Sequence, residues 1–144
     1  MPTRGFDVAH YSDIEPVPME PGDPEWRPVR HHFGLRAFGT GLFRGVQPGD
    51  MVIEEHDERV DDEAGGHEEL YFVAGGHAEF VVDGDVIDAP AGTFVVVRDT
   101  DLVRSARAKV SETLVLAVGG PREEAYEVSD WEKRYLGRAG ISDR

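Results

Sequence analysis

Cysteine is absent from the 144 residues of this sequence. The absence excludes disulfides, a thiolate nucleophile and a zinc site with cysteine ligands, and it fits the reducing cytoplasm, where we expect the protein to lie. No stretch approaches the roughly 20 apolar residues that a membrane-spanning helix needs. Residues 1–13 lack the apolar segment of a signal peptide, so we expect none.

Positive charge is also scarce. Lysine occurs only at Lys109 and Lys133, and the formal net charge is −14. A surface of this charge repels polyanions and anionic lipids. We therefore expect neither nucleic acid nor a membrane as a partner.

The length suits one domain, which we divide into three segments. Residues 1–29 are expected to form an extended N-terminal arm, because five prolines between Pro16 and Pro28 exclude a continuous helix there. Residues 30–119 are the expected barrel. Residues 120–144 are a tail in which Ser129 and Glu132 have the spacing of a helix capping box, which predicts a short C-terminal helix.

Short β-rich runs separated by turn signals fill residues 30–119. The runs are MVIEEH, ELYFVA, HAEFVV, DVIDA, TFVVVR and ETLVLAV, and the first turn signal is Gly39-Thr40-Gly41. This spacing predicts an all-β antiparallel sandwich or barrel, with a two-residue hairpin loop at Asp83-Gly84. His31 and His32 fall on an expected early strand, where adjacent residues face opposite sides, so at most one of them reaches the interior.

The run HEELYFV carries the residues best suited to chemistry. Alternate side chains of a strand share one face, which groups His67, Glu69 and Tyr71 and turns Leu70 and Phe72 the other way. An imidazole, a carboxylate and a phenol together can bind a divalent metal, or act as an acid, a base and a hydrogen-bond donor.

The stretch ELYFVAGGHAEFVVDG resembles the cupin superfamily, whose first motif reads G-x5-H-x-H-x3,4-E-x6-G. Glu69 and Gly76 match the end of this motif, and the resemblance covers about residues 49 to 119. It implies a double-stranded β-helix, a jelly-roll barrel with its site inside, and it implies a homodimer. It leaves the activity open, since cupins include oxygenases, isomerases, decarboxylases, storage proteins and sugar-sensing domains.

The metal ligands of the resembled family, three histidines and a glutamate, are only partly present. Counting forward from Gly49 places Glu55 and Asp57, not His56, at the first two histidine positions. The second motif reads G-x5-P-x-G-x2-H-x3-N, and counting from Gly92 places Val103 at its histidine position. The last histidine is therefore missing.

Three arginines, Arg98, Arg104 and Arg107, lie in the region of the second motif. Arginine suits bidentate binding of a carboxylate or phosphate, so an inward arginine would hold an anionic ligand or pair with Glu69. Solvated arginines at the barrel rim are the alternative. The candidate catalytic residues are Glu69, Tyr71 and Arg104, and the candidate ligand-binding residues are Tyr71, Arg104 and Arg107.

Three functions stay open at this point. In the first, His56, His67 and Glu69 hold one divalent ion (Fe, Mn, Ni or Zn), with His32 or water completing the shell, and the protein binds or acts on a small molecule. In the second, a metal-free cupin binds a small molecule through Tyr71 and an arginine. In the third, the chain is a structural dimeric domain. The sequence does not decide between an enzyme and a binding module.

Overall fold

The computed structural model describes residues 5–59, 63 and 66–142. These residues form two short helical segments and β1 in the N-terminal part, eight further strands, and one C-terminal helix. The elements are η1 (Tyr11–Asp13), β1 (Glu25–Arg27), α1 (Val29–Phe33), β2 (Gly39–Gly45), β3 (Met51–His56), β4 (Glu68–Gly75), β5 (His77–Val82), β6 (Asp85–Pro90), β7 (Phe94–Val97), β8 (Arg104–Ala108), β9 (Thr113–Gly120) and α2 (Asp130–Arg138).

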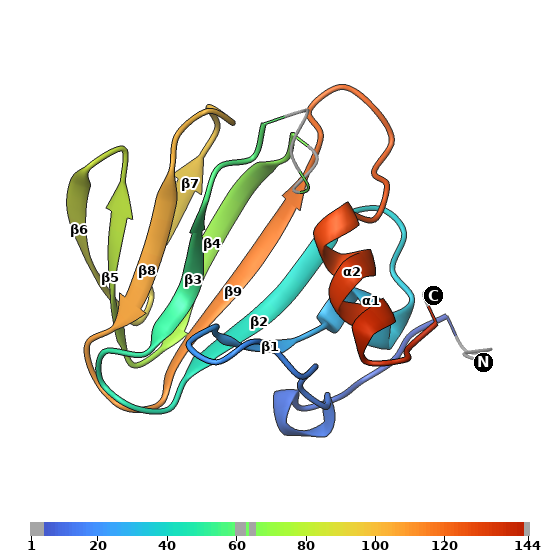
Figure 1. Ribbon diagram of the computed structural model, residues 1–144, viewed down its shortest axis with the longest axis horizontal. Helices are drawn as coiled ribbons and strands as arrows, with labels where there is room; N and C mark the ends of the chain where they lie inside the picture. The colour runs from blue at the N-terminus through green and yellow to red at the C-terminus, as the bar shows by residue number, and fades with distance from the viewer. Residues whose placement is uncertain (1–4, 60–62, 64–65, 143–144) are drawn as a thin grey trace.

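The strands form two antiparallel sheets that pack face to face (Figure 1). One sheet has the order β1-β2-β9-β4-β7 and the other the order β3-β8-β5-β6. Tyr71 and Val73 of β4 pair with Ala117 and Val115 of β9, and all four side chains enter the core between the sheets. The predicted all-β barrel is therefore confirmed.

The hairpin predicted at Asp83-Gly84 is also confirmed. Val82 pairs with Asp85 across the loop, and both loop residues have positive φ, 49° at Asp83 and 82° at Gly84. Two positive φ angles are what a type I′ turn requires, and such a turn follows the twist of the strands it joins.

Two local predictions are wrong. The segment with His31 and His32 is not a strand but the short helix α1, which ends at Gly34 in the left-handed conformation with φ 66°, its N–H bonded to the carbonyls of Arg30 and His31. Gly39-Thr40-Gly41 is not a turn but the start of β2, paired along its length with β9. These glycines provide room, because a Cβ at Gly41 would lie 2.7 Å from Nε1 of Trp26.

Helix α2 forms where the capping box predicts it. The Ser129 hydroxyl accepts a hydrogen bond from the Glu132 amide at 3.2 Å. The side chains of Tyr135 and Leu136 are buried against Trp26 of β1, which joins the arm to the tail. Among the described residues, no helix is long and apolar enough to cross a membrane.

A buried ion pair fixes α2 against α1, which lies beside it in Figure 1. The Arg30 Nε donates to Glu132 Oε2 at 2.7 Å, and Arg30 Nη1 donates to the Leu35 carbonyl at 3.0 Å. The Arg30 side chain is fully buried. The two helices therefore form a fixed wall beside the barrel.

Candidate functional site

A cavity of about 460 Å³ lies between the two sheets and α2. Its walls come from β1, β2, β3, β4 and β9, from the segment after β9, and from α2. One end carries His56, Glu58, Glu69 and Tyr71, and the other carries Trp26, Phe43 and Trp131. The two ends differ in chemistry, and the polar end is the first candidate for a functional centre.

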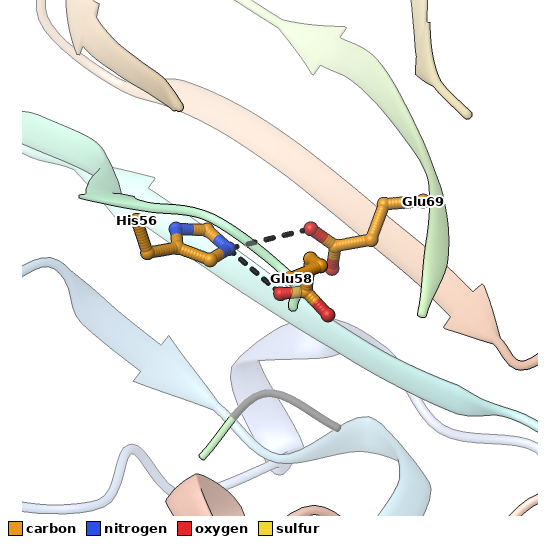
Figure 2. A group of neighbouring side chains, drawn as sticks. All are labelled: His56, Glu58 and Glu69. Carbon is orange, nitrogen blue, oxygen red and sulfur yellow. Dashed lines mark ion pairs between the residues drawn. The ribbon is translucent and has the colours of Figure 1, made fainter. Parts of the chain in front are cut away.

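Three side chains converge at the polar end (Figure 2). The His56 Nε2 lies 2.9 Å from Glu58 Oε2 and 3.4 Å from Glu69 Oε1. The three groups offer ligand atoms that all lie within 4.8 Å of one another. The structure thus brings together two of the predicted metal ligands, His56 and Glu69, and adds Glu58.

Irregular pairing of β3 with β8 explains why counting along the sequence missed this set. The register shifts between Met51 and Ile53 and again between Ile53 and His56. Such irregularities change which side chains face inward without changing the sequence. As a result His56 and Glu58 reach Glu69, rather than Glu55 and Asp57, which the motif count had placed there.

Glu69 is held by three groups at one oxygen. Its Oε1 accepts a short hydrogen bond from the Tyr71 hydroxyl, accepts another from Arg104 Nη1 at 3.2 Å, and faces His56 Nε2. The same Arg104 nitrogen lies 3.9 Å from Glu58 Oε2. Arg104 is fully buried, so its charge acts on both carboxylates with little screening by water.

The close contacts shift the protonation of His56 and Glu58. Burial disfavours the charged imidazole, but hydrogen bonds with Glu58 and Glu69 outweigh it and raise the pKa of His56 to about 10. Burial raises the pKa of Glu58, against the hydrogen bond from His56. Without a metal, the site therefore keeps a proton on His56 that is shared with two carboxylates.

The pKa values of Glu69 and Tyr71 shift in the directions that this charge distribution requires. Burial opposes ionisation of Glu69, but the hydrogen bond from His56 and the charges of His56 and Arg104 lower its pKa. Burial, followed by the negative charge of Glu69, raises the pKa of Tyr71 well above its usual value. Tyr71 therefore stays a neutral donor, and Glu69 stays an acceptor.

The orientation of His56 suits a metal ligand. Its Nδ1 is 2.6 Å from the Glu54 carbonyl oxygen, and only a protonated Nδ1 can donate there. This hydrogen bond leaves Nε2 facing the two carboxylates, an arrangement common for histidines that bind metals. One imidazole and two carboxylates fit a first-row divalent ion such as Fe, Mn, Ni or Zn.

The remaining predicted residues lie elsewhere. His67 lines the cavity beside Glu58, with Nδ1 3.9 Å from Glu58 Oε1, and its ring contacts Tyr126, outside the group of three. Burial lowers the pKa of His67. The exposed Arg107 donates to the Gly49 carbonyl at 3.0 Å and does not line the cavity, and neither does His32.

A close approach between strands shapes the wall next to Glu69. A Cβ at Gly119 would lie 3.1 Å from Glu69 Cγ and 3.0 Å from the Glu68 carbonyl oxygen. Any larger residue there would displace Glu69 or the backbone of β4. The position of the carboxylate thus depends on a glycine on the adjacent strand.

Sequence reasoning missed several lining residues. Glu58 lies in an acidic stretch with no strand pattern, and its spacing of two from His56 was the available signal. Tyr126, Ser129, Trp131 and Glu132 come from the tail, for which the sequence predicted only a short helix. The tail therefore also forms one wall of the cavity.

Comparisons with known proteins agree with this architecture. No protein-family model matches the sequence, and no curated protein matches it. The structure of KdgF from a Halomonas species is similar at TM-score 0.62 and 18% identity, covering 83% of this chain and 96% of that one.

Two further solved structures resemble the chain to the same degree. A predicted oxalate decarboxylase from Thermotoga maritima aligns at TM-score 0.61 and 19% identity, over 78% of this chain and 97% of that one. An RmlC-like cupin from Shewanella frigidimarina aligns at TM-score 0.57 and 16% identity, over 83% and 95%. The resemblance inferred from ELYFVAGGHAEFVVDG is confirmed at the level of fold: this chain has the double-stranded β-helix fold of the cupins, with its candidate site inside the barrel.

Proposed function

We propose that this chain binds a small molecule in its barrel cavity, next to a divalent metal ion held by His56, Glu58 and Glu69. The observation that carries the proposal is the convergence of three ligand atoms within 4.8 Å at the polar end of a cavity of about 460 Å³. When bound, such an ion supplies a Lewis acid or an oxygen-binding centre.

The residues of the chain have distinct parts in this proposal. The Glu54 carbonyl fixes the imidazole of His56, and Tyr71 together with Arg104 fixes the Glu69 carboxylate. Tyr71 is a neutral hydroxyl whose only donated proton goes to Glu69, so it orients that carboxylate rather than the ligand. The low exposure of Glu58, 4%, limits competition from water.

A metal-free cupin is the second candidate, and Arg104 favours it. The buried guanidinium lies where a cation is needed to compensate Glu58 and Glu69. With a proton on His56, the two carboxylates face two positive charges and the site is balanced. A metal ion must displace the His56 proton, so the proton and the metal compete for the same position.

Metal analysis of untagged protein, purified without added metal, tests the proposal. We expect stoichiometric binding of a first-row divalent ion in calorimetric titration, strong loss of binding in His56→Ala, and retained binding in His67→Ala. The two variants remove the same side chain from the same cavity and differ only in membership of the group of three. Absence of binding by Mn²⁺, Fe²⁺, Ni²⁺ and Zn²⁺ would leave the metal-free candidate.

The expected homodimer remains a proposal, supported by an apolar outer face on the five-stranded sheet. Phe94 and Val96 of β7 are 63% and 41% exposed there, and Phe72 of β4 contacts Phe94 at 4.6 Å between ring centroids. Two copies with a net charge of −14 repel each other, so an uncharged face is where they can associate. Light scattering of the wild type and of Phe94→Glu tests the homodimer, since a monomeric wild type contradicts it.

The cytoplasmic location also remains a prediction.

A further inference from the structure

The cavity is strongly acidic. Seven of its described lining residues carry carboxylates, namely Glu54, Glu55, Asp57, Glu58, Glu63, Glu69 and Glu132, and none of the described lining residues is lysine or arginine. The two buried arginines nearby lie behind this wall. Against these seven carboxylates the lining carries the protonated His56, so its balance of charge is negative and disfavours an anion.

Most of these carboxylates already have a cationic partner. Glu132 pairs with Arg30 at 2.7 Å, and Glu63 pairs with Arg134 at 3.1 Å. Glu58 and Glu69 share His56 and Arg104, as described above. These pairs belong to the framework of the cavity.

Glu54 differs from the paired carboxylates. The Trp131 side chain donates a hydrogen bond to it, but its Oε2 atom is buried without a partner among the described residues. A buried acceptor without a donor destabilises the folded protein. A ligand that brings an N–H group to this oxygen would remove that destabilisation.

Aromatic side chains line the same cavity as Glu54. Trp131 of α2 packs edge-on against Trp26 of β1 with ring centroids 4.8 Å apart, and Phe43 of β2 lies 6.5 Å from Trp131. Aromatic rings attract organic cations through the negative charge of their faces. The three rings and the incompletely bonded carboxylate of Glu54 line one cavity, and together they favour a positive group that carries N–H donors.

We propose that the cavity takes an organic amine, with its primary ammonium group at Glu54 and against the wall of Trp26, Phe43 and Trp131. The inference rests on the proposed binding of a small molecule, and it does not depend on the metal. It changes the expected class of ligand, because the arginines of the sequence had pointed to an anionic molecule. In the structure Arg104 is occupied by Glu69, and Arg107 is outside the cavity.

Three probes of similar size and different charge test this inference: n-butylamine, n-butanol and butyrate. Each is titrated into protein stripped of metal with a chelator, at constant ionic strength and neutral pH. Tryptophan fluorescence is the readout, because the only two tryptophans of the chain, Trp26 and Trp131, both line the cavity. We expect saturable binding of the amine, weaker binding of the alcohol and no binding of butyrate.

The isosteric variant Glu54→Gln identifies the carboxylate. We expect its affinity for n-butylamine to fall roughly tenfold, the effect of losing one charge-assisted hydrogen bond. Glu79→Gln removes the same charge from an exposed position on β5 and should bind the amine like the wild type. Butanol binding should be unchanged in both variants.

The inference is overturned if the amine does not saturate at tens of millimolar, if butyrate binds as well as the amine, or if Glu54→Gln retains wild-type amine affinity. The separate metal titration keeps the two proposals apart. Protein that binds the amine but no metal refutes the metal site alone, and protein that binds metal but prefers butyrate refutes the amine alone.

Discussion

Two buried arginines, Arg30 and Arg104, have the same exposure and different surroundings. Each is fully buried and each contacts a carboxylate. Arg30 donates from Nε to Glu132 and from Nη1 to a carbonyl oxygen. Arg104 donates only from Nη1, and its Nε and Nη2 have no partner among the described residues.

The difference shows that the two arginines have different effects: Arg30 stabilises the packing of two helices, whereas Arg104 places a positive charge beside the carboxylates of the candidate site. The bonds of Arg30 offset the cost of burying its charge, as expected for a pair that fixes one helix to another. Arg104 leaves two donors unsatisfied, at a cost in stability, and still faces both carboxylates of the candidate site. Its burial beside the two carboxylates is explained by its charge rather than by its hydrogen bonds. Three variants test this comparison.

Arg30→Met should give the largest loss of stability. It leaves Glu132 buried without its partner, and breaking a buried pair in this way costs about 3–5 kcal/mol. Urea unfolding measures the loss, with the exposed Arg98→Met as control. A loss no larger than that of the control would mean that α2 is held by its apolar contacts alone.

Arg104→Met should cost less stability, about 2–3 kcal/mol, because fewer hydrogen bonds are broken. Removing the positive charge beside Glu58 and Glu69 should also tighten binding of a divalent ion, roughly tenfold. Unfolding and calorimetry with and without Mn²⁺ measure both effects, and Arg107→Met is the exposed control. Weaker metal binding in Arg104→Met would show that the arginine is needed to position the ligands.

Ser129→Ala should have the smallest effect, about 1 kcal/mol, since it removes only the cap at the start of α2. The Glu132 carboxylate would keep its bond to Arg30 in this variant, so the helix should remain in place. Thermal unfolding measures the change. A loss as large as that of Arg30→Met would indicate that the cap, and not the ion pair, determines whether α2 docks.

Much of the fold could be predicted from local patterns. Residues 51–56 and 77–82 were identified as strand runs and form β3 and β5 with those bounds, and the turn at Asp83-Gly84 follows from two residues that tolerate positive φ. These features depend on neighbours in sequence. The segment with His31 and His32 was misassigned because its helix is set by the termination at Gly34 and by the burial of Arg30 against α2, a contact with a distant part of the chain.

The candidate site could be predicted only in part, for a similar reason. His56 and Glu69 were recognised, and the inward face of Tyr71 followed from strand alternation. Glu58 and the partnership of Arg104 with Glu69 depend on irregular pairing between β3 and β8, which no spacing in the sequence reveals. A shift of one residue separates the Val103 position of the motif count from the Arg104 side chain that reaches the site.

The composite wall of the cavity has a consequence for the order of events during synthesis. Trp26 is made early, the barrel strands follow, and Tyr126, Trp131 and Glu132 leave the ribosome only after β9. Chains fold as they emerge, so the barrel can pair its strands while one wall of the cavity is still missing. A nascent chain halted at Gly120 would contain His56, Glu58 and Glu69 but would have no closed cavity around them. The cavity is thus closed only when α2 docks and Arg30 gains its partner.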